Sequence, residues 1–248
     1  MKGSGKIVCV TAYDAYFGRI ADESGVDVIL VGDSLANVIL GYPSTVNVTL
    51  EEMAHHVRAV RRGVSRSLLV ADLPFGSYNS SVSQAVDSAV VLMKAGAEAV
   101  KLEGDYPEAI HAMVKAGIPV MGHVGMTPQS VNVFGGFRVQ GKGDAGDRVL
   151  EEAKSIQSAG AFAVVLELVP ATLSSRITHE IQIPTIGIGG GPNCDGQIQV
   201  IYDILGLSKE SYKHSKRFAD GEQLFAKGLR DYACEVRNEV FPTSENSF

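Results

Sequence analysis

The chain has 248 residues, of which 45% are hydrophobic and 20% are charged, and its formal net charge is −6 at pH 7. This composition excludes an intrinsically disordered protein, and the length suits a single α/β barrel. The acidic balance, without a long basic block, argues against a nucleic-acid partner, because phosphate binding needs clustered Lys and Arg.

Three cysteines, Cys9, Cys194 and Cys234, lie far apart, and no CxxC spacing occurs. They therefore indicate neither a disulfide framework nor a zinc knuckle. The N-terminal segment is too short and polar for a signal peptide, and no apolar run has membrane-spanning length. We expect a cytoplasmic protein with no membrane partner.

One pattern recurs from the N-terminus onward: a short apolar run, a loop and an amphipathic stretch. The apolar runs predict eight strands, which begin near Ile7, Asp27, Ser67, Glu98, Ile118, Phe162, Ile183 and Gln197. Apolar residues at three- and four-residue spacing predict helices over residues 16–23, 50–62, 82–95, 107–115, 146–159 and 173–180. Glycines just before the next strand mark several helix ends, since glycine suits the left-handed residue after a helix.

Several predicted strands lack strict polar alternation, which is typical of parallel strands covered on both faces. Alternating strands and helices without an obvious linker predict a single domain over residues 1–248, a (β/α)8 TIM barrel with a C-terminal helical extension. A doubly wound open sheet is the alternative. Residues 207–240 should form helices that pack on the barrel or on an adjacent subunit. Two long loops, residues 34–49 and 125–145, follow strands at the end where barrel enzymes place their chemistry.

Four acidic residues end four of the apolar runs: Asp33, Asp72, Glu103 and Glu167. Burying an unpaired carboxylate is costly, and the C-terminal ends of parallel strands meet at one rim. A rim that gathers acids needs a cation. The sequence therefore predicts a metal-dependent enzyme.

Asp33, Asp72 and Glu103 come from consecutive strands, so we predict that they share one metal ion. An all-oxygen ligand set favours Mg²⁺, with Mn²⁺ as an alternative. The open positions of such an ion suit the carboxylate and carbonyl of a 2-oxo acid, which would place Asp33 and Asp72 beside the substrate as well. Coordination of the carbonyl would acidify the neighbouring C–H and allow enolate chemistry.

Ser34, Lys101 and His123 lie next to this trio and could bind the substrate carboxylate or a developing oxyanion. Glu167 lies two strands away from the trio and is the candidate for proton transfer. Simpler interpretations stay open. A strand-end acid often caps the next helix or holds a loop, and Lys101 could be a structural salt-bridge partner of Glu103.

A glycine run within residues 186–191 offers two further interpretations. It could cradle a phosphate after a late barrel strand, or the glycines could serve close packing alone.

The most distinctive stretch is Gly122-His-Val-Gly-Met-Thr-Pro-Gln-Ser130, which continues through residues 132–141. Further matching stretches run in order over nearly the whole chain, at residues 11–14, 31–35, 71–75, 100–104, 166–167, 169–170, 186–189 and 195–197. In these stretches the chain resembles the ketopantoate hydroxymethyltransferase (3-methyl-2-oxobutanoate hydroxymethyltransferase) family.

The resemblance implies a barrel of the phosphoenolpyruvate-mutase and isocitrate-lyase type. It implies Mg²⁺ bound by Asp33, Asp72 and Glu103, substrate contacts from Ser34, Lys101 and His123, and Glu167 as the acid/base. The implied reaction transfers a hydroxymethyl group from 5,10-methylenetetrahydrofolate to 3-methyl-2-oxobutanoate through a Mg²⁺-stabilised enolate, giving 2-dehydropantoate in pantothenate synthesis. The family also implies a homo-oligomer, typically a decamer.

Two rival functions remain to be weighed. A carbon–carbon lyase or mutase on the same barrel would carry a reactive cysteine in a Lys-Lys-Cys-Gly-type loop, and no such segment occurs. A catalytically silent barrel would have lost members of the acid cluster, and all of its members are present.

Overall fold

The structure is a computed structural model that describes residues 2–210 and 212–248. The chain divides into two compact units, Met1–Val200 and Ile201–Phe248. The expectation of one domain, with residues 207–240 packed on the barrel or on another subunit, stays a prediction.

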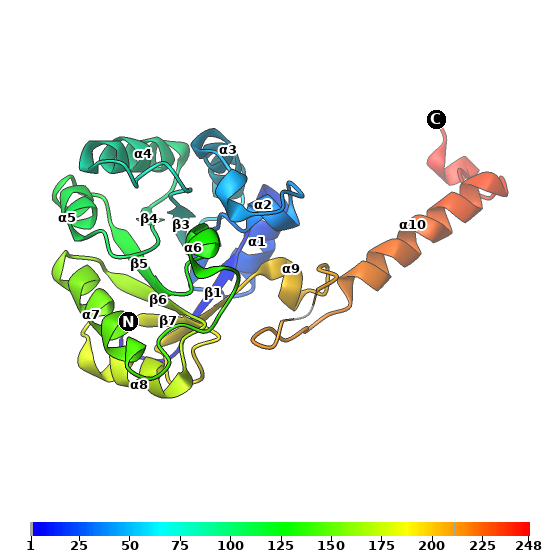
Figure 1. Ribbon diagram of the computed structural model, residues 1–248. Helices are drawn as coiled ribbons and strands as arrows, with labels where there is room; N and C mark the ends of the chain where they lie inside the picture. Colours follow the sequence, from blue (N-terminus) through cyan, green and yellow to red (C-terminus); the bar gives the residue numbers. More distant parts are fainter. Residues whose placement is uncertain (1, 211) are drawn as a thin grey trace. The chain divides into compact units, whose positions relative to one another are not determined.

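The first unit is a closed barrel of eight parallel strands in sequential order (Figure 1), which confirms the predicted fold. The strands are β1 (Ile7–Thr11), β2 (Val28–Val31), β3 (Leu68–Asp72), β4 (Ala99–Lys101), β5 (Val120–Gly125), β6 (Ala163–Glu167), β7 (Thr185–Ile188) and β8 (Gly196–Gln199). Every strand begins within two residues of its predicted start. The open-sheet alternative is excluded, because β1 pairs with β8.

All six predicted helices are present, with ends within two residues of the prediction: α1 (Ala15–Glu23), α3 (Leu50–Arg61), α4 (Val82–Ala95), α5 (Pro107–Lys115), α7 (Ala145–Ser158) and α8 (Ala171–Glu180). Their starts follow local chemistry. Asp14 caps α1 by accepting a hydrogen bond from Phe17 N, and Thr49 with Glu52 forms a capping box at α3.

Short helices that the sequence analysis missed lie inside the two long loops. The first loop holds α2 (Leu35–Val38) and the 3-10 helix η1 (Thr45–Asn47). The second holds η2 (Pro128–Ser130) and α6 (Val131–Phe134), and in Figure 1 α6 lies in front of the barrel strands. These helices are too short to show a repeating apolar spacing, which is why periodicity did not reveal them.

No helix stands between β7 and β8, so the repeat of strand and helix is broken once. The glycines in β7 and just after it pack against the protein itself. A Cβ at Gly187 would lie 2.9 Å from Cys194 Sγ, and one at Gly191 would lie 2.6 Å from Ala171 Cβ. Close packing therefore explains this glycine run, and no helix N-terminus follows it to receive a phosphate.

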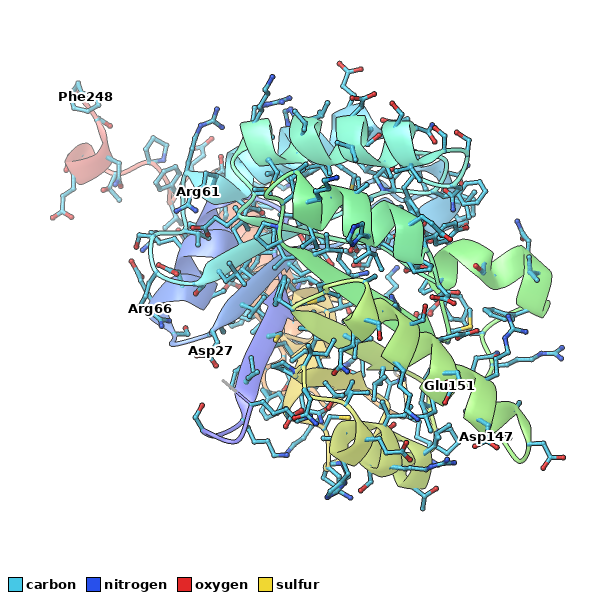
Figure 2. All side chains as sticks on the ribbon, turned by 90° about the vertical axis from the view of Figure 1, so that its left-hand side faces the viewer. Asp27, Arg61, Arg66, Asp147, Glu151 and Phe248 are labelled. Atoms are coloured by element: carbon cyan, nitrogen blue, oxygen red, sulfur yellow. The ribbon has the colours of Figure 1, made fainter. Side chains whose placement is uncertain are left out.

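The barrel interior is apolar for most of its length and becomes polar toward the C-terminal ends of the strands. The interior cluster contains side chains from all eight strands, such as Cys9, Val70 and Ile198. Nearer the C-terminal ends of the strands, Asp72 of β3 is the register partner of Lys101 of β4. The two ends of the barrel are marked in Figure 2 by Asp27, just before β2, and by Asp147, at the start of α7.

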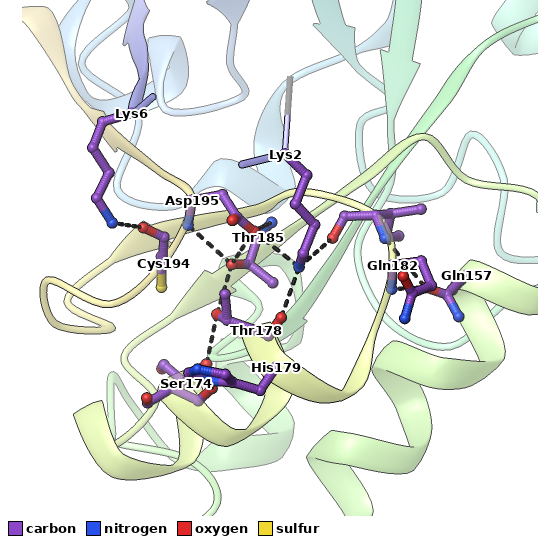
Figure 3. Close-up of polar contacts among 12 residues, drawn as sticks. Lys2, Lys6, Gln157, Ser174, Thr178, His179, Gln182, Thr185, Cys194 and Asp195 are labelled. Atoms are coloured by element: carbon purple, nitrogen blue, oxygen red, sulfur yellow. Dashed lines mark hydrogen bonds and ion pairs between the residues drawn. The ribbon is translucent and has the colours of Figure 1, made fainter. Parts of the chain in front are cut away.

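The N-terminal end of the barrel is closed by a polar network around Lys2 (Figure 3). Lys2 Nζ donates to Thr178 O at 2.7 Å and forms an ion pair with Asp195 Oδ2 at 3.1 Å. Asp195 Oδ2 also accepts from Thr185 N at 2.9 Å, and Thr178 Oγ1 lies 2.7 Å from Thr185 Oγ1. This end is occupied by structural contacts, which leaves the opposite rim for chemistry.

The second unit contains α9 (Ile201–Ile204), α10 (Gly221–Arg237) and the 3-10 helix η3 (Ser244–Asn246). Across the described part of the chain, no helix combines the length and the apolar character needed to cross a bilayer.

Candidate active site

The four strand-end acids lie at the C-terminal rim of the barrel. Asp72 and Glu167 are the last residues of β3 and β6, whereas Asp33 and Glu103 follow the ends of β2 and β4. Asp33, Asp72 and Glu103 are only 5%, 2% and 3% exposed, and the Glu167 side chain is 15% exposed. β2 ends at Val31, two residues before Asp33. The position of the Asp33 side chain is therefore set by the turn after the strand and not by the alternation of side chains along the strand.

Each carboxylate of the trio has one oxygen held by an N–H group of the protein. Asp72 Oδ2 accepts from Asp33 N at 3.0 Å, Asp33 Oδ2 accepts from Gln129 Nε2 at 2.8 Å, and Glu103 Oε2 accepts from Gln129 N at 2.9 Å. These bonds hold the loops after β2 and β5 and do not cap the helix that follows each strand. Of the simpler interpretations of these acids, loop holding therefore fits the structure, and it leaves room for a ligand role. The second oxygen of each carboxylate is left for other partners.

Lys101 pairs with Asp72 and not with Glu103, the partner considered from the sequence. Lys101 Nζ lies 2.7 Å from Asp72 Oδ1, and both side chains are buried. Burial lowers the pKa of Lys101, but the charges of Asp72 and the other acids outweigh burial and raise it. Lys101 is therefore a buried ammonium at neutral pH.

His123, in β5, lies between two acids. Its Nδ1 is 3.4 Å from Glu103 Oε1, and its Nε2 is 3.3 Å from Glu167 Oε2. Burial and the charge of Lys101 lower the pKa of His123, but hydrogen bonding to Glu103 and Glu167 prevails and raises it to about 9. The ring is therefore an imidazolium that links the trio to Glu167.

The charges at this rim do not balance. Burial and the neighbouring charges of Glu103 and Asp72 raise the pKa of Asp33 well above its usual range. Three buried carboxyl groups stand beside two cations, Lys101 and His123, so ionisation of all three leaves an excess of negative charge. A divalent cation would favour the ionised form of Asp33.

The donor chemistry also fits a hard divalent ion, although the side chains do not yet converge on one point. Asp72 Oδ1 is buried and has only its ion pair with Lys101. Within residues 2–210 and 212–248, no group of three His, Cys, Asp or Glu side chains is already arranged to hold a metal ion. Coordination would therefore require small rotations that bring the second oxygens of the trio together.

Ser34 lies beside Asp33, and its Oγ is 2.8 Å from the hydroxyl of Tyr13. Tyr13 is almost fully buried and had not been singled out from the sequence, although it falls within a stretch that carries the family resemblance. A phenol that fixes the serine hydroxyl gives Ser34 a defined direction at the rim.

The long loop after β5 is tied to the end of β6, next to Glu167. Met126 N donates to Glu167 O at 2.8 Å, and Gln140 N donates to Leu168 O at 3.0 Å. At Gly125, which has φ +94°, a Cβ would lie 2.4 Å from Glu167 O, so only glycine allows this approach. Leu168 itself has φ +47°, a strained conformation for a branched side chain.

Comparison with known proteins gives a consistent result. A model of the family described as ketopantoate hydroxymethyltransferase matches residues 1–244. The chain is 50% identical to the 3-methyl-2-oxobutanoate hydroxymethyltransferase of Thermotoga maritima, over 100% of this chain and 93% of that protein. It is 52% identical to the enzyme of the same name from Carboxydothermus hydrogenoformans, over 100% and 92% of the two chains.

Solved structures with the same fold are more distant in sequence. A phosphonopyruvate hydrolase matches with a TM-score of 0.63 and 12% identity, over 97% of this chain and 88% of that chain. A 2,3-dimethylmalate lyase, described as a member of the PEP mutase/isocitrate lyase superfamily, matches with a TM-score of 0.62 and 14% identity, over 98% and 86%. These similarities support the barrel fold alone.

Proposed function

Because the chain belongs to the ketopantoate hydroxymethyltransferase family, we propose that it transfers a hydroxymethyl group from 5,10-methylenetetrahydrofolate to 3-methyl-2-oxobutanoate, giving 2-dehydropantoate for pantothenate synthesis. The observation that carries the proposal is the buried carboxylate trio at the barrel mouth, in which an N–H group of the protein fixes one oxygen of each acid, and Lys101 and His123 lie beside the second oxygens of Asp72 and Glu103. The enzyme is a transferase, as its relatives are.

Asp33, Asp72 and Glu103 would hold a Mg²⁺ ion in each subunit, with Mn²⁺ as a substitute. Their oxygen donors support this assignment, as does the raised pKa of Asp33, which burial and the neighbouring charges of Glu103 and Asp72 cause. When bound, the ion would polarise the carbonyl of the 2-oxo acid and make the proton on its C3 more acidic.

The protein's own cations orient the substrate. Lys101 Nζ lies 3.4 Å from His123 Nδ1, and the two side chains can together attract the carboxylate of the 2-oxo acid. The Ser34 hydroxyl, fixed by Tyr13, can donate a further hydrogen bond to a substrate oxygen. Asp33 and Asp72 border the same position, so the substrate would lie between the trio and Glu167.

Glu167 would act as the base at C3. Its carboxylate is on β6, beyond β5 and separate from the trio, and it is the most exposed of the four acids. His123 Nε2 holds one of its oxygens at 3.3 Å and leaves the other for the proton. The carbon that loses the proton then attacks the one-carbon unit of the folate.

The folate would approach over the loop after β5. Val133 and Phe137 in this loop are 85% and 65% exposed, and both ends of the loop are tied to the site. Exposed apolar side chains beside the mouth suit a flat, bulky co-substrate.

A homo-oligomer, a decamer by family resemblance, is part of the same proposal. Helix α10 carries exposed Leu224, Phe225 and Leu229, which are 67%, 54% and 70% exposed, and a second copy of the chain would cover such side chains. We also place the enzyme in the cytoplasm, where free cysteines stay reduced.

An assay for 2-dehydropantoate tests the reaction directly. The purified enzyme with Mg²⁺ and 3-methyl-2-oxobutanoate should form product only when 5,10-methylenetetrahydrofolate is present. Equal product formation without 5,10-methylenetetrahydrofolate would show that another one-carbon donor is used.

A further inference from the structure

Gln129 connects the site more extensively than any residue considered from the sequence. It lies in η2, just after β5, and is 5% exposed. Its hydrogen bonds reach the segments that follow β2, β3 and β4, so one residue spans the strand ends that carry the trio.

Every polar group of the Gln129 side chain is used. The amide Nε2 donates to Asp33 Oδ2 at 2.8 Å and to Leu73 O at 3.0 Å. The amide Oε1 accepts from the hydroxyl of Tyr78 at 2.7 Å. The backbone N donates to Glu103 Oε2 at 2.9 Å. A buried amide that satisfies both donors and its acceptor is held in one orientation.

The two partners of Nε2 determine which way the amide points, and a hydrogen bond from Tyr78 supports this orientation. Both partners of Nε2 are acceptors, so a flipped amide would set oxygen against the Asp33 carboxylate and the Leu73 carbonyl. The buried Tyr78 hydroxyl lies 2.7 Å from Oε1 and 3.1 Å from Glu103 O, and it can donate to either oxygen. The flipped state therefore loses the two hydrogen bonds of Nε2 and sets oxygen against two acceptors.

We propose that Gln129 is a positioning residue for the metal ligands, supported by Tyr78. It holds Oδ2 of Asp33 and Oε2 of Glu103, so that Oδ1 and Oε1 are the oxygens presented to a divalent ion. This inference rests on the proposed function of the trio. It extends that function to two residues that would touch neither metal nor substrate.

The direction of the effect follows from ligand chemistry. A carboxylate without its outer hydrogen bond rotates more freely and must be ordered when the ion binds. Loss of such an outer partner typically weakens metal affinity about 10- to 100-fold. The side-chain amide holds Asp33 directly, whereas Glu103 is held by the backbone N of the same residue. We therefore expect removal of the amide to act mainly through Asp33.

The test measures Mn²⁺ binding to the full-length protein without substrate, by electron paramagnetic resonance of the free ion. Gln129→Met keeps the length of the side chain and removes its donors and acceptor. We expect the Kd for Mn²⁺ to rise about 10- to 100-fold. Tyr78→Phe, which loses only the orienting hydroxyl, should raise the Kd less, and it should add nothing further in the Gln129→Met background.

The matched control is Thr178→Val, at the opposite end of the barrel (Figure 3). This substitution also removes buried hydrogen bonds, to Ser174 O and to the Thr185 hydroxyl, each 2.7 Å long. It should lower the melting temperature of the metal-free protein and leave the Kd for Mn²⁺ unchanged. An equal change of Kd in Thr178→Val and Gln129→Met would overturn the inference, because general loosening would then explain both.

The outcomes separate the two proposals. If the wild-type protein does not bind Mn²⁺, the assignment of the trio fails. If the wild type binds and Gln129→Met binds equally well, the trio stands and the role of Gln129 is refuted. Should Gln129→Met not fold, Tyr78→Phe decides alone: an unchanged Kd refutes the inference, and a raised Kd supports it.

Discussion

Lys101 Nζ lies 2.7 Å from Asp72 Oδ1, and the two residues are direct register partners across β3 and β4. Both side chains are buried, at 5% and 3% exposure. The carboxylate assigned to a metal therefore already has a fixed cation beside it. A dication at the trio would share Asp72 with this ammonium.

Substitution of Lys101 should show that Lys101 and the metal ion stabilise the same Asp72 carboxylate. Lys101→Met leaves the Asp72 carboxylate buried without its cation, which should lower the free energy of unfolding by about 3 kcal/mol in metal-free buffer. Excess Mg²⁺ should recover part of the loss, because the ion can neutralise the same carboxylate. Urea denaturation of both proteins, with and without Mg²⁺, measures the two effects. Equal stability of the variant and the wild type in metal-free buffer would contradict the account.

Glu167→Gln tests the separation of base and metal ligands. The amide keeps the shape of the side chain but cannot accept the C3 proton, so kcat should fall by about 10²- to 10⁴-fold. The Kd for Mn²⁺ should stay within a factor of two of wild type, since order-of-magnitude losses are expected only for ligands and their partners. Glu180→Gln, on α8 and bonded to Lys154 and Arg176 at the surface, is the control and should change neither value. A large loss of metal affinity in Glu167→Gln would instead move Glu167 into the coordination sphere.

The fold has its own acid-sensitive contact at Asp22, near the end of α1. Asp22 is buried and accepts hydrogen bonds from the backbone N–H groups of Ser65, Arg66 and Ser67. Burial raises the pKa of this carboxyl, but the hydrogen bonds from Ser67 and Ser65 prevail and hold the pKa well below its usual range. A depressed folded-state pKa contributes stability above the unfolded pKa of about 3.9, and the contribution is lost as pH falls through the folded value.

Asp22→Asn should therefore cost about 2 kcal/mol of unfolding free energy at pH 7. The difference from wild type should shrink as the pH is lowered below about 4. Asp231→Asn, at an exposed carboxyl on α10, should show neither effect. Denaturation curves at several pH values measure the unfolding free energy of each protein. A difference in unfolding free energy between Asp22→Asn and wild type that stays constant across the whole pH range would refute the proposed role of the Asp22 carboxylate.

The sequence was informative where one strand or helix carries its own signal. Strand-end acids such as Asp72 and Glu167 could be found because apolar runs end at them, and parallel strands bring such ends to one rim. The family resemblance added the substrates, which no spacing could supply. The break between β7 and β8 agrees with the predicted helices, none of which falls between the strands predicted to begin near Ile183 and Gln197.

The supporting contacts could not be predicted because they join residues far apart in the chain. Gln129 bonds to Asp33 across 96 positions and to Tyr78 across 51, and no local pattern marks such a pair. The partner of Lys101 was also misassigned. A position two residues from Glu103 suggested that acid, whereas barrel register sets Lys101 beside Asp72.

The central claim is that the carboxylate trio, through a divalent ion, makes C3 of a 2-oxo acid lose its proton. The most direct measurement follows 3-methyl-2-oxobutanoate in D₂O by proton NMR, with enzyme and Mg²⁺ but without folate. The wild type should replace the C3 proton by deuterium, so that the methyl doublet collapses, and chelation of Mg²⁺ or Asp72→Asn should abolish this exchange. Exchange that continues at the wild-type rate in Asp72→Asn, or after Mg²⁺ has been chelated, would contradict the claim.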